Sequence, residues 1–383
     1  MPQFLHNLHA IRGLACVLVV VTHLGVWERQ FGIRKPLLAW TEWFGYAAVD
    51  LFFVLSGFVI TYTQMANLGK RSAFIGYTRA RLWRVFPMFW MMLPLAVLQV
   101  HLVSGEPLTD PGSDRLGRWL SWIFLVPHHA MNPYLPTAWT LPFELFFYLL
   151  FGVLILFPRR LAVVALGIWA ASAVFVPWVY GTETATWHPL FHAVCSPHVL
   201  EIVAGCGAAW LVRSGWLIAG RTCISLGVIW AATLVSVCNP HTVPMYLAVD
   251  PWGRALTFGV AGVLIVYGFV VIEMRNGWRF PGWTKPFGDA SYSIYLGHIP
   301  ACSLVFGTTF WWWPQHTGPH ILWMLTMLAA GLGGGWMFYR LVERPLLKLG
   351  KRSKHREPKP IPESPVIITQ VYRHATATPT MMS

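Results

Sequence analysis

The stretch RGLACVLVVVTH, residues 12–23, lies in the first long apolar run of the sequence and carries an ionisable side chain at each end. A helix of about 20 mostly apolar residues crosses a bilayer, and residues 8–27 around this stretch have that length. Placing a charge in such a helix costs about 2.5–3.5 kcal/mol on insertion scales. The stretch therefore predicts a membrane helix in which Arg12 and His23 have a task that offsets this cost.

The composition of the whole chain indicates a membrane protein. Of 383 residues, 56% are hydrophobic and only 11% are charged, which lies outside the range of soluble globular domains. The formal net charge is +13, but the basic residues fall between the apolar runs and near the C-terminus. Such positions are typical of topology signals. We therefore predict a lipid bilayer as the surroundings of this chain and no nucleic-acid partner.

Apolar runs of spanning length recur and predict an all-α polytopic membrane protein with about ten transmembrane helices. The expected spans are residues 8–27, 43–63, 85–103, 138–157, 161–180, 191–212, 221–238, 252–273, 289–311 and 319–341. The run 116–127 is too short to cross, so we expect it at the interface or re-entering. Lysine and arginine concentrate in alternate loops, which predicts both termini in the cytoplasm. Residues 1–346 form the predicted membrane domain, and the basic, proline-rich residues 347–383 form a cytoplasmic tail predicted to be disordered.

Three titratable residues are expected to meet in the outer third of the bundle. Asp50 in the second span and Glu144 in the fourth lie at a depth similar to that of His23. A carboxylate beside an imidazole holds its tautomer and stabilises its protonated form, which is the arrangement that a general base needs. The alternative is a buried ion pair that fastens helices together, with His23 hydrogen-bonded in the bundle.

A second polar group is expected at the inner face. Arg81 and Arg84, just before the third span, lie on one side of a helix turn, and Arg12 lies at the same level. Arg12 and His23 share one face of the first helix but are separated by roughly 16 Å along its axis. Grouped guanidinium groups suit phosphate recognition. The alternatives are ordinary positive-inside flanking for the pair and snorkelling to the headgroups for Arg12.

Further polar residues lie in other spans with less specific patterns. Helical spacing puts Tyr295 on one face with Ser291 and, less closely, with His298. Ser56 has no neighbouring base in the sequence, which favours a packing or hydrogen-bonding role. The residues of a possible substrate pocket are Ser56, Tyr292, Tyr295 and His298.

The sequence contains no recognisable metal-binding or hydrolase motif. The sixth expected span contains four potential metal ligands whose spacing fits no known site, so no metal is predicted. They are His192, Cys195, His198 and Glu201. The sequence contains no GxSxG, HExxH, Walker or GxGxxG motif, which argues against serine-hydrolase and ATPase chemistry.

Six motifs follow one another in an order that is specific to one family. They are the R-x10-H pattern of Arg12 and His23, FFVLSGFVI (52–60), RLWR (81–84), AWTLPFE (138–144), SYSIYLGH (291–298) and LVERP (341–345). From about residue 5 to 346 the chain therefore resembles the acyltransferase-3 family of bacterial membrane O-acyltransferases. The chain is expected to be a stand-alone form without a C-terminal hydrolase-like domain.

The resemblance implies a reaction and its direction. An acyl group, most often acetyl, passes from cytoplasmic acyl-CoA to a hydroxyl of a sugar in a cell-envelope polysaccharide, a glycolipid or a similar acceptor. Acyl-CoA is then a donor substrate, no cofactor is permanently bound, and the enzyme resides in the bacterial inner membrane. The long loop at 104–137 is the expected acceptor contact.

The resemblance implies a role for each residue of this sequence that matches a functional position in the family's motifs. His23 becomes the catalytic base and Glu144 supports the reacting centre, while the CoA phosphates are held by Arg12, Arg81 and Arg84. Asp50 as a catalytic residue and a role for His298 are added from their depth, and whether His23 or His298 is the main base is open. Buried Asp, Glu and His residues also build proton relays, so the alternative is a proton-coupled transporter or flippase of an envelope intermediate. The acceptor and the oligomeric state are open.

Overall fold

The computed structural model describes residues 3–30, 37–104, 115–127, 134–180, 189–237, 251–309 and 320–352. Those residues contain helices and turns but no strand, which confirms the all-helical prediction. The long helices are α1 (His6–Gln30), α2 (Glu42–Gln64), α3 (Ala73–Ser104), α5 (Leu141–Ile155), α6 (Arg159–Tyr180), α8 (His198–Arg213), α9 (Gly220–Val237), α12 (Val260–Asn276), α13 (Lys285–Thr309) and α14 (His320–Phe338). The short helices are α4 (Arg115–Phe124), α7 (Pro189–Cys195), α11 (Pro251–Arg254) and α15 (Arg344–Arg352).

Single turns of tighter or wider helix connect or interrupt these elements. The 3-10 turns are Ala39–Thr41, Met65–Asn67, Pro136–Thr140 and Gly282–Thr284. Two π-helical turns are Ala255–Gly259, which leads into α12, and Tyr339–Glu343, which joins α14 to α15. Such widened turns re-aim the side chains around them and are frequent at functional sites.

Among the described residues, seven helical segments are long and apolar enough to cross a membrane. They are His6–Arg29, Gly45–Asn67, Ala73–Leu102, Pro136–Ile155, Arg159–Tyr180, Pro251–Asn276 and Ile321–Gly350. The predicted count of ten is therefore not confirmed. The run 191–212 is broken around Pro197 into α7 and α8, because proline has no N–H for the helix ladder. The run 221–238 contributes only a short apolar helix, Gly220–Leu234, and α13 carries a row of polar side chains.

The described residues include only parts of the predicted C-terminal tail and of the predicted loop 104–137. The run 116–127 forms the ten-residue helix α4, which is too short to cross a bilayer. Residues 347–352 of the expected tail belong to α15, and residues 353–383 lie outside the described residues. Residues 105–114 and 128–133 of the loop 104–137 also lie outside the described residues. The orientation of the termini stays a prediction.

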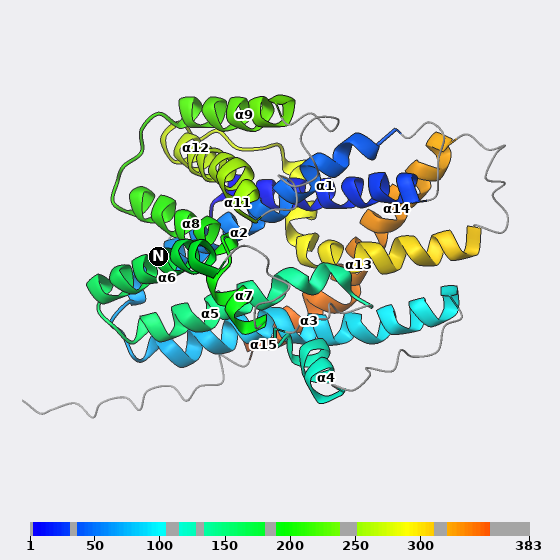
Figure 1. The fold of residues 1–383 in the computed structure, drawn as a ribbon, viewed down its shortest axis with the longest axis horizontal. Helices are drawn as coiled ribbons and strands as arrows, with labels where there is room; N and C mark the ends of the chain where they lie inside the picture. Colours follow the sequence, from blue (N-terminus) through cyan, green and yellow to red (C-terminus); the bar gives the residue numbers. More distant parts are fainter. Residues whose placement is uncertain are drawn as a thin grey trace, which may run out of the picture.

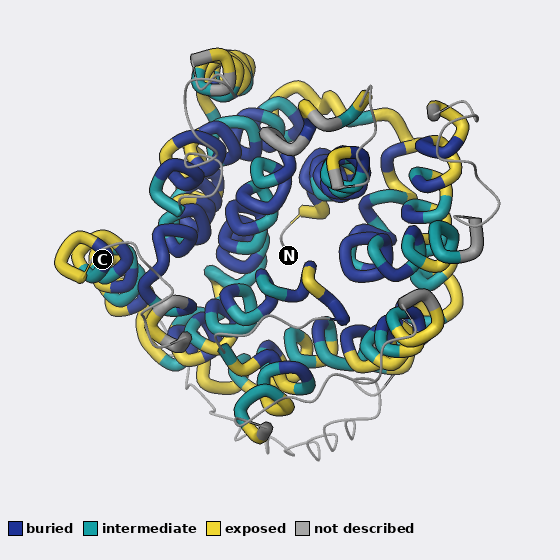
Figure 2. The backbone as a smooth tube through the Cα atoms, turned by 45° about the vertical axis from the view of Figure 1, so that its right-hand side comes forward, coloured by how far each residue is buried: buried dark blue, intermediate teal, exposed yellow. Residues whose placement is uncertain are grey.

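The long helices lie side by side, with most axes along the long dimension of the molecule (Figure 1). Buried residues face the interior of this bundle and exposed residues face outward (Figure 2). Large apolar side chains are among the exposed ones, including Ile75, Ile168 and Trp178. Lipid solvates such side chains, whereas a soluble protein exposes few of them together. The chain is a multi-pass membrane protein.

Glycine residues allow helices α2 and α8 to pack in close contact, which fixes the positions of the polar residues on α2. A Cβ added at Gly57 of α2 would lie 1.9 Å from the carbonyl oxygen of Ile202 in α8, and one added at Gly205 would lie 2.1 Å from that of Val54. Small residues at such contacts let two membrane helices pack backbone to backbone. The contact fixes α2, which carries Asp50 and Ser56, against α8.

Helix α3 begins earlier than predicted. It starts at Ala73 rather than near residue 85, so Arg84 lies about 16 Å into the helix at 1.5 Å per residue. Arg81 and Arg84 are therefore residues of α3 rather than of a loop ahead of it, and their level relative to the membrane stays a prediction. Their charge is tolerated in an apolar helix because their side chains face an internal cavity instead of lipid.

Candidate active site

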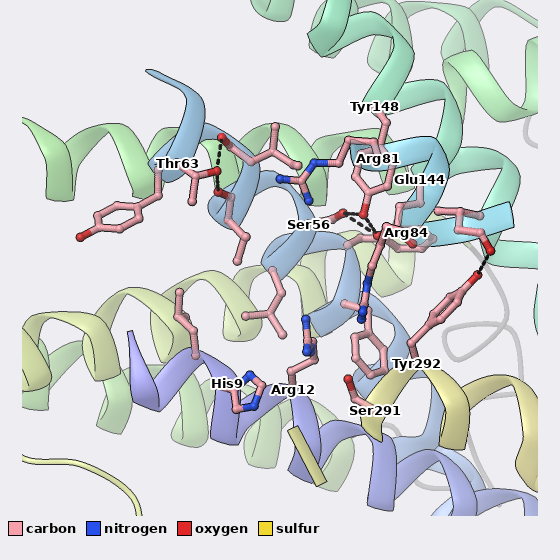
Figure 3. Close-up of a pocket in the computed structure, with 18 of the residues that line it drawn as sticks. His9, Arg12, Ser56, Thr63, Arg81, Arg84, Glu144, Tyr148, Ser291 and Tyr292 are labelled. Atoms are coloured by element: carbon pink, nitrogen blue, oxygen red, sulfur yellow. Dashed lines mark hydrogen bonds between the residues drawn. The ribbon is translucent and has the colours of Figure 1, made fainter. Parts of the chain in front are cut away.

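A cavity of about 400 Å³ lies inside the bundle. Its lining comes from α1, α2, α3, α5 and α13 and from residues 3–5 ahead of α1. Figure 3 shows its polar side chains entering from several of these helices. The three arginines of the sequence prediction, Arg12, Arg81 and Arg84, all line it. The structure thus brings together the residues that were expected to bind an anion.

Each of the three guanidinium groups is held by a different neighbour. Nη2 of Arg12 donates to the carbonyl oxygen of Gly288 at 2.7 Å. The guanidinium of Arg81 lies 5.6 Å from the ring centres of both Tyr77 and Tyr148. The Nε atoms of Arg12 and Arg81 are buried and have no hydrogen-bond acceptor among the described residues. Buried donors normally have partners, so the guanidinium groups of Arg12 and Arg81 have hydrogen-bonding capacity that the described residues leave unused.

The third arginine is fixed by a carboxylate from the far end of the chain. Nη1 of Arg84 donates to Oε1 of Glu343 at 2.7 Å, and Ser293 Oγ donates to the other carboxylate oxygen at 2.6 Å. Glu343 is 1% exposed. The guanidinium also lies 5.3 Å from the ring centre of Tyr292, which lines the cavity. Glu343 belongs to the LVERP motif but had no predicted role, because nothing local indicates its partner.

Glu144 lies in this cavity with the arginines. Ser56 Oγ donates to Oε1 of Glu144 at 3.0 Å, and the hydroxyl of Tyr148, one turn later, donates to the same oxygen. Glu144 was expected beside His23 and Asp50, and that grouping was wrong. Its helix, α5, has only 15 residues and follows a 3-10 turn, so a depth counted along the sequence does not give the level of the residue in the bundle.

Asp50 forms a separate buried cluster. Nη2 and Nε of Arg254 donate to its two carboxylate oxygens, the second at 3.3 Å. His198 Nδ1 lies 4.0 Å from Asp50 Oδ1 and 3.4 Å from Glu201 Oε1. All four residues are at most 3% exposed. For Asp50 the structure favours the ion-pair alternative: it pairs with Arg254 and does not contact His23.

The ligand atoms of Asp50, His198 and Glu201 lie within 4.8 Å of one another, as in a metal site. However, both Asp50 oxygens already accept from Arg254, whose guanidinium is also flanked by Tyr46 at 4.6 Å and Trp139 at 5.5 Å. A cation next to that guanidinium would be repelled. Arg254, which the sequence prediction overlooked, was detectable as an arginine inside an apolar span.

His23 contacts a second histidine. Its Nδ1 lies 2.9 Å from the carbonyl oxygen of Val19 and 3.3 Å from Nε2 of His298. Nδ1 of His298 lies 2.9 Å from the carbonyl oxygen of Ile294. His23 is partly exposed, whereas His298 is 1% exposed. The partner of the imidazole is thus another imidazole and not a carboxylate.

The histidine pair lies beyond the cavity. Neither His23 nor His298 lines it, but Tyr295, one turn before His298 on α13, does. The hydroxyl of Tyr295 donates to the carbonyl oxygen of Thr137 at 2.9 Å and lies 3.0 Å from Thr140 Oγ1. This contact ties α13 to the 3-10 turn Pro136–Thr140 that precedes α5. Of the predicted pocket residues, Ser56, Tyr292 and Tyr295 line the cavity and His298 does not.

Comparison with known proteins gives a consistent result. A family model described as an acyltransferase domain matches residues 5–340. The exopolysaccharide production protein ExoZ of Rhizobium meliloti is 30% identical over 319 residues, which cover 80% of this chain and 91% of that protein. The peptidoglycan O-acetyltransferase OatA of Listeria monocytogenes is 21% identical over 379 residues, covering 91% of this chain and 56% of that protein. The acyltransferase MdmB of Streptomyces mycarofaciens is 26% identical over 384 residues, covering 91% and 93%. No solved structure matches the chain.

Proposed function

The chain belongs to the acyltransferase family, and we propose that this membrane O-acyltransferase takes an acetyl group from acyl-CoA and transfers it to a sugar hydroxyl of a cell-envelope polysaccharide or glycolipid. The names of ExoZ and OatA, which refer to an exopolysaccharide and to peptidoglycan, support an envelope polymer as the acceptor. The protein lies in the bacterial inner membrane with both termini in the cytoplasm, consistent with its basic loops.

The proposal that acyl-CoA is the donor is supported by the cavity that three guanidinium groups line. Arg12, Arg81 and Arg84 face one space, and two buried Nε donors lack an acceptor among the described residues. CoA carries phosphates, which arginine binds with paired, charge-assisted hydrogen bonds. In this proposal the phosphates enter from the cytoplasmic end, where residues 3–5 line the cavity. Among the described residues, Arg12 and Arg81 have no ion pair that the phosphates would displace.

The acceptor half uses His23. The base removes the proton of the acceptor hydroxyl, whose oxygen attacks the thioester carbonyl. The new C–O bond forms, the C–S bond breaks, and the imidazolium returns its proton to the leaving sulfur. Arg12 and His23 lie roughly 16 Å apart along α1. In acyl-CoA the flexible pantetheine arm likewise separates the phosphates, which Arg12 would bind, from the thioester, which would lie near His23. To reach His23 the arm must pass Tyr295, so this proposal requires the hydrogen bonds of Tyr295 to the 3-10 turn Pro136–Thr140 to open.

The test measures whether a labelled acetyl group becomes covalently attached to the acceptor. Membranes with the wild-type protein, labelled acetyl-CoA and an envelope glycan fraction should yield labelled, alkali-sensitive glycan. His23→Ala should lower the rate about 10²–10⁴-fold, the usual contribution of a general base, at normal expression and unchanged CoA affinity. A fully active His23→Ala protein would refute the role of His23. Movement of an envelope intermediate that depends on a proton gradient, without label on the glycan, would instead indicate the transporter.

A further inference from the structure

We propose that His298 is a positioning residue that selects the tautomer of His23 and stabilises its protonated form. This inference rests on the proposed function of His23 as the base. It assigns different roles to two histidines whose rings lie 4.9 Å apart with an interplanar angle of 61°. It also decides which of the four ring nitrogens receives the proton of the acceptor.

The proton of His298 is located by its backbone partner. Nδ1 of His298 lies 2.9 Å from the carbonyl oxygen of Ile294. A carbonyl oxygen only accepts, so Nδ1 carries the hydrogen, and a neutral imidazole has only one. Nε2 of His298 is therefore a lone-pair acceptor, and it faces Nδ1 of His23 at 3.3 Å.

The same reasoning applies to His23. Its Nδ1 faces two acceptors, the carbonyl oxygen of Val19 at 2.9 Å and Nε2 of His298 at 3.3 Å. Nδ1 of His23 thus carries the hydrogen and shares it between them. Nε2 of His23 is left with its lone pair, and no hydrogen bond to it occurs in the part of the chain that the structure describes. It is the one nitrogen of the pair that is ready to take a proton.

Burial assigns the roles. His298 is 1% exposed and uses both ring nitrogens, so it cannot meet a substrate in this arrangement. His23 is partly exposed and has one nitrogen available. Once Nε2 of His23 is protonated, Nδ1–H remains and its hydrogen bond to His298 becomes charge-assisted, about twice as strong as a neutral one. The imidazolium is thereby stabilised without a buried carboxylate.

Packing holds His298 in this position. A Cβ added at Gly331 of α14 would lie 2.9 Å from Cys302 Sγ, 3.0 Å from a methyl group of Val20 and 3.4 Å from the Cβ of His298. The absence of a side chain at Gly331 lets α14 approach α1 and α13 where the two rings meet. Helix α13 therefore has little freedom to rotate His298 away from His23.

The kinetic test compares two substitutions of similar size. His298→Leu removes the acceptor and should lower kcat about 10–100-fold, the range for losing a hydrogen bond to a charged group, with KM for acetyl-CoA changed less than about twofold. His298→Gln offers an amide oxygen near the position of Nε2 and should recover most of the loss. Equal losses in both variants at normal folded yield, or full activity of His298→Leu, would overturn the proposal.

A second measurement separates this inference from the proposed reaction. Nitrogen-15 spectra of the ring-labelled protein in detergent, with the His23 signals assigned from a His23→Gln sample, report which nitrogen carries the proton. We expect the Nδ1–H tautomer in the wild type and its partial loss in His298→Leu. An Nε2–H tautomer of His23 would refute the positioning role even if the enzyme is active. The expected tautomer without any acyl transfer would leave the positioning geometry intact and refute the proposed function.

Discussion

Two buried polar clusters of this protein use the same residue types in opposite ways. The cavity cluster has three arginines and two carboxylates, namely Arg12, Arg81, Arg84, Glu144 and Glu343. The closed cluster has one arginine and two carboxylates, namely Arg254, Asp50 and Glu201, with His198 between the acids. Both are buried in apolar helices, so burial of charge does not by itself identify a ligand site.

The difference lies in which partners are missing. In the cavity cluster two buried guanidinium donors lack an acceptor, whereas in the closed cluster one carboxylate oxygen, Oε2 of Glu201, lacks a donor among the described residues. Only the first cluster lines a cavity of about 400 Å³. An excess of positive donors together with space is what an anionic substrate needs. We therefore assign substrate binding to the cavity cluster and helix fastening to the closed cluster.

The largest expected effect is on folding and concerns the closed cluster. Arg254→Met leaves the carboxyl group of Asp50 without its partner in the bundle, and breaking a buried pair typically costs about 3–5 kcal/mol. We expect a marked loss of folded protein, measured by thermal unfolding in detergent. Arg254→Met combined with Asp50→Asn should recover part of the stability. A single variant as stable as the wild type would contradict the fastening role.

The next effect is on donor binding and concerns the cavity cluster. Arg81→Ala with Arg84→Ala removes two guanidinium groups that face the cavity and should weaken CoA affinity about 10–100-fold, measured by calorimetry on protein in detergent. Arg79→Ala on the same helix is the matched control, because Arg79 is exposed and does not line the cavity. Unchanged affinity in the double variant would argue against phosphate binding there.

A change of opposite sign is expected when a carboxylate of the cavity cluster is neutralised. Glu343→Gln keeps the shape of the side chain and its contacts with Arg84 and Ser293 but removes one negative charge. The cavity becomes more positive, so CoA should bind up to about tenfold more tightly, with the gain declining as salt is added. Binding weakened by more than about tenfold would instead show that the charge of Glu343 is needed to place Arg84.

The smallest expected effect is at Ser56. Ser56→Ala removes one hydrogen bond to Glu144, while the bond from Tyr148 remains, so stability should fall by about 1–2 kcal/mol. The acyl-transfer rate should change less than about tenfold. A loss of activity as large as that of His23→Ala would contradict this and indicate that the Ser56 hydroxyl takes part in the chemistry.

Much of the fold and part of the site could be predicted from local patterns. Apolar length predicted the seven candidate spans among the described residues, but also three further runs that are not confirmed as spans. The six motifs predicted the family, which the family match confirms. Arg12, Arg81 and Arg84 were correctly placed in one group, although α3 begins at Ala73, well before the predicted start of the third span. Predictions failed where they compared depth between helices, as for Glu144 and Asp50, because helices begin at different levels and a residue count along one of them says nothing about its neighbour.

By itself the sequence determined that this protein resides in a lipid bilayer and which charged and titratable side chains its apolar helices contain. The 3.6-residue period of a helix put Arg12 and His23 on one face, because periodicity is a local property of the chain. Only the tertiary structure decided which groups meet: Asp50 with Arg254, Arg84 with Glu343, and His23 with His298. These pairs depend on how far each helix is shifted and rotated against the next. Close packing at residues such as Gly57 and Gly331 sets those shifts, and no pattern within one helix records them.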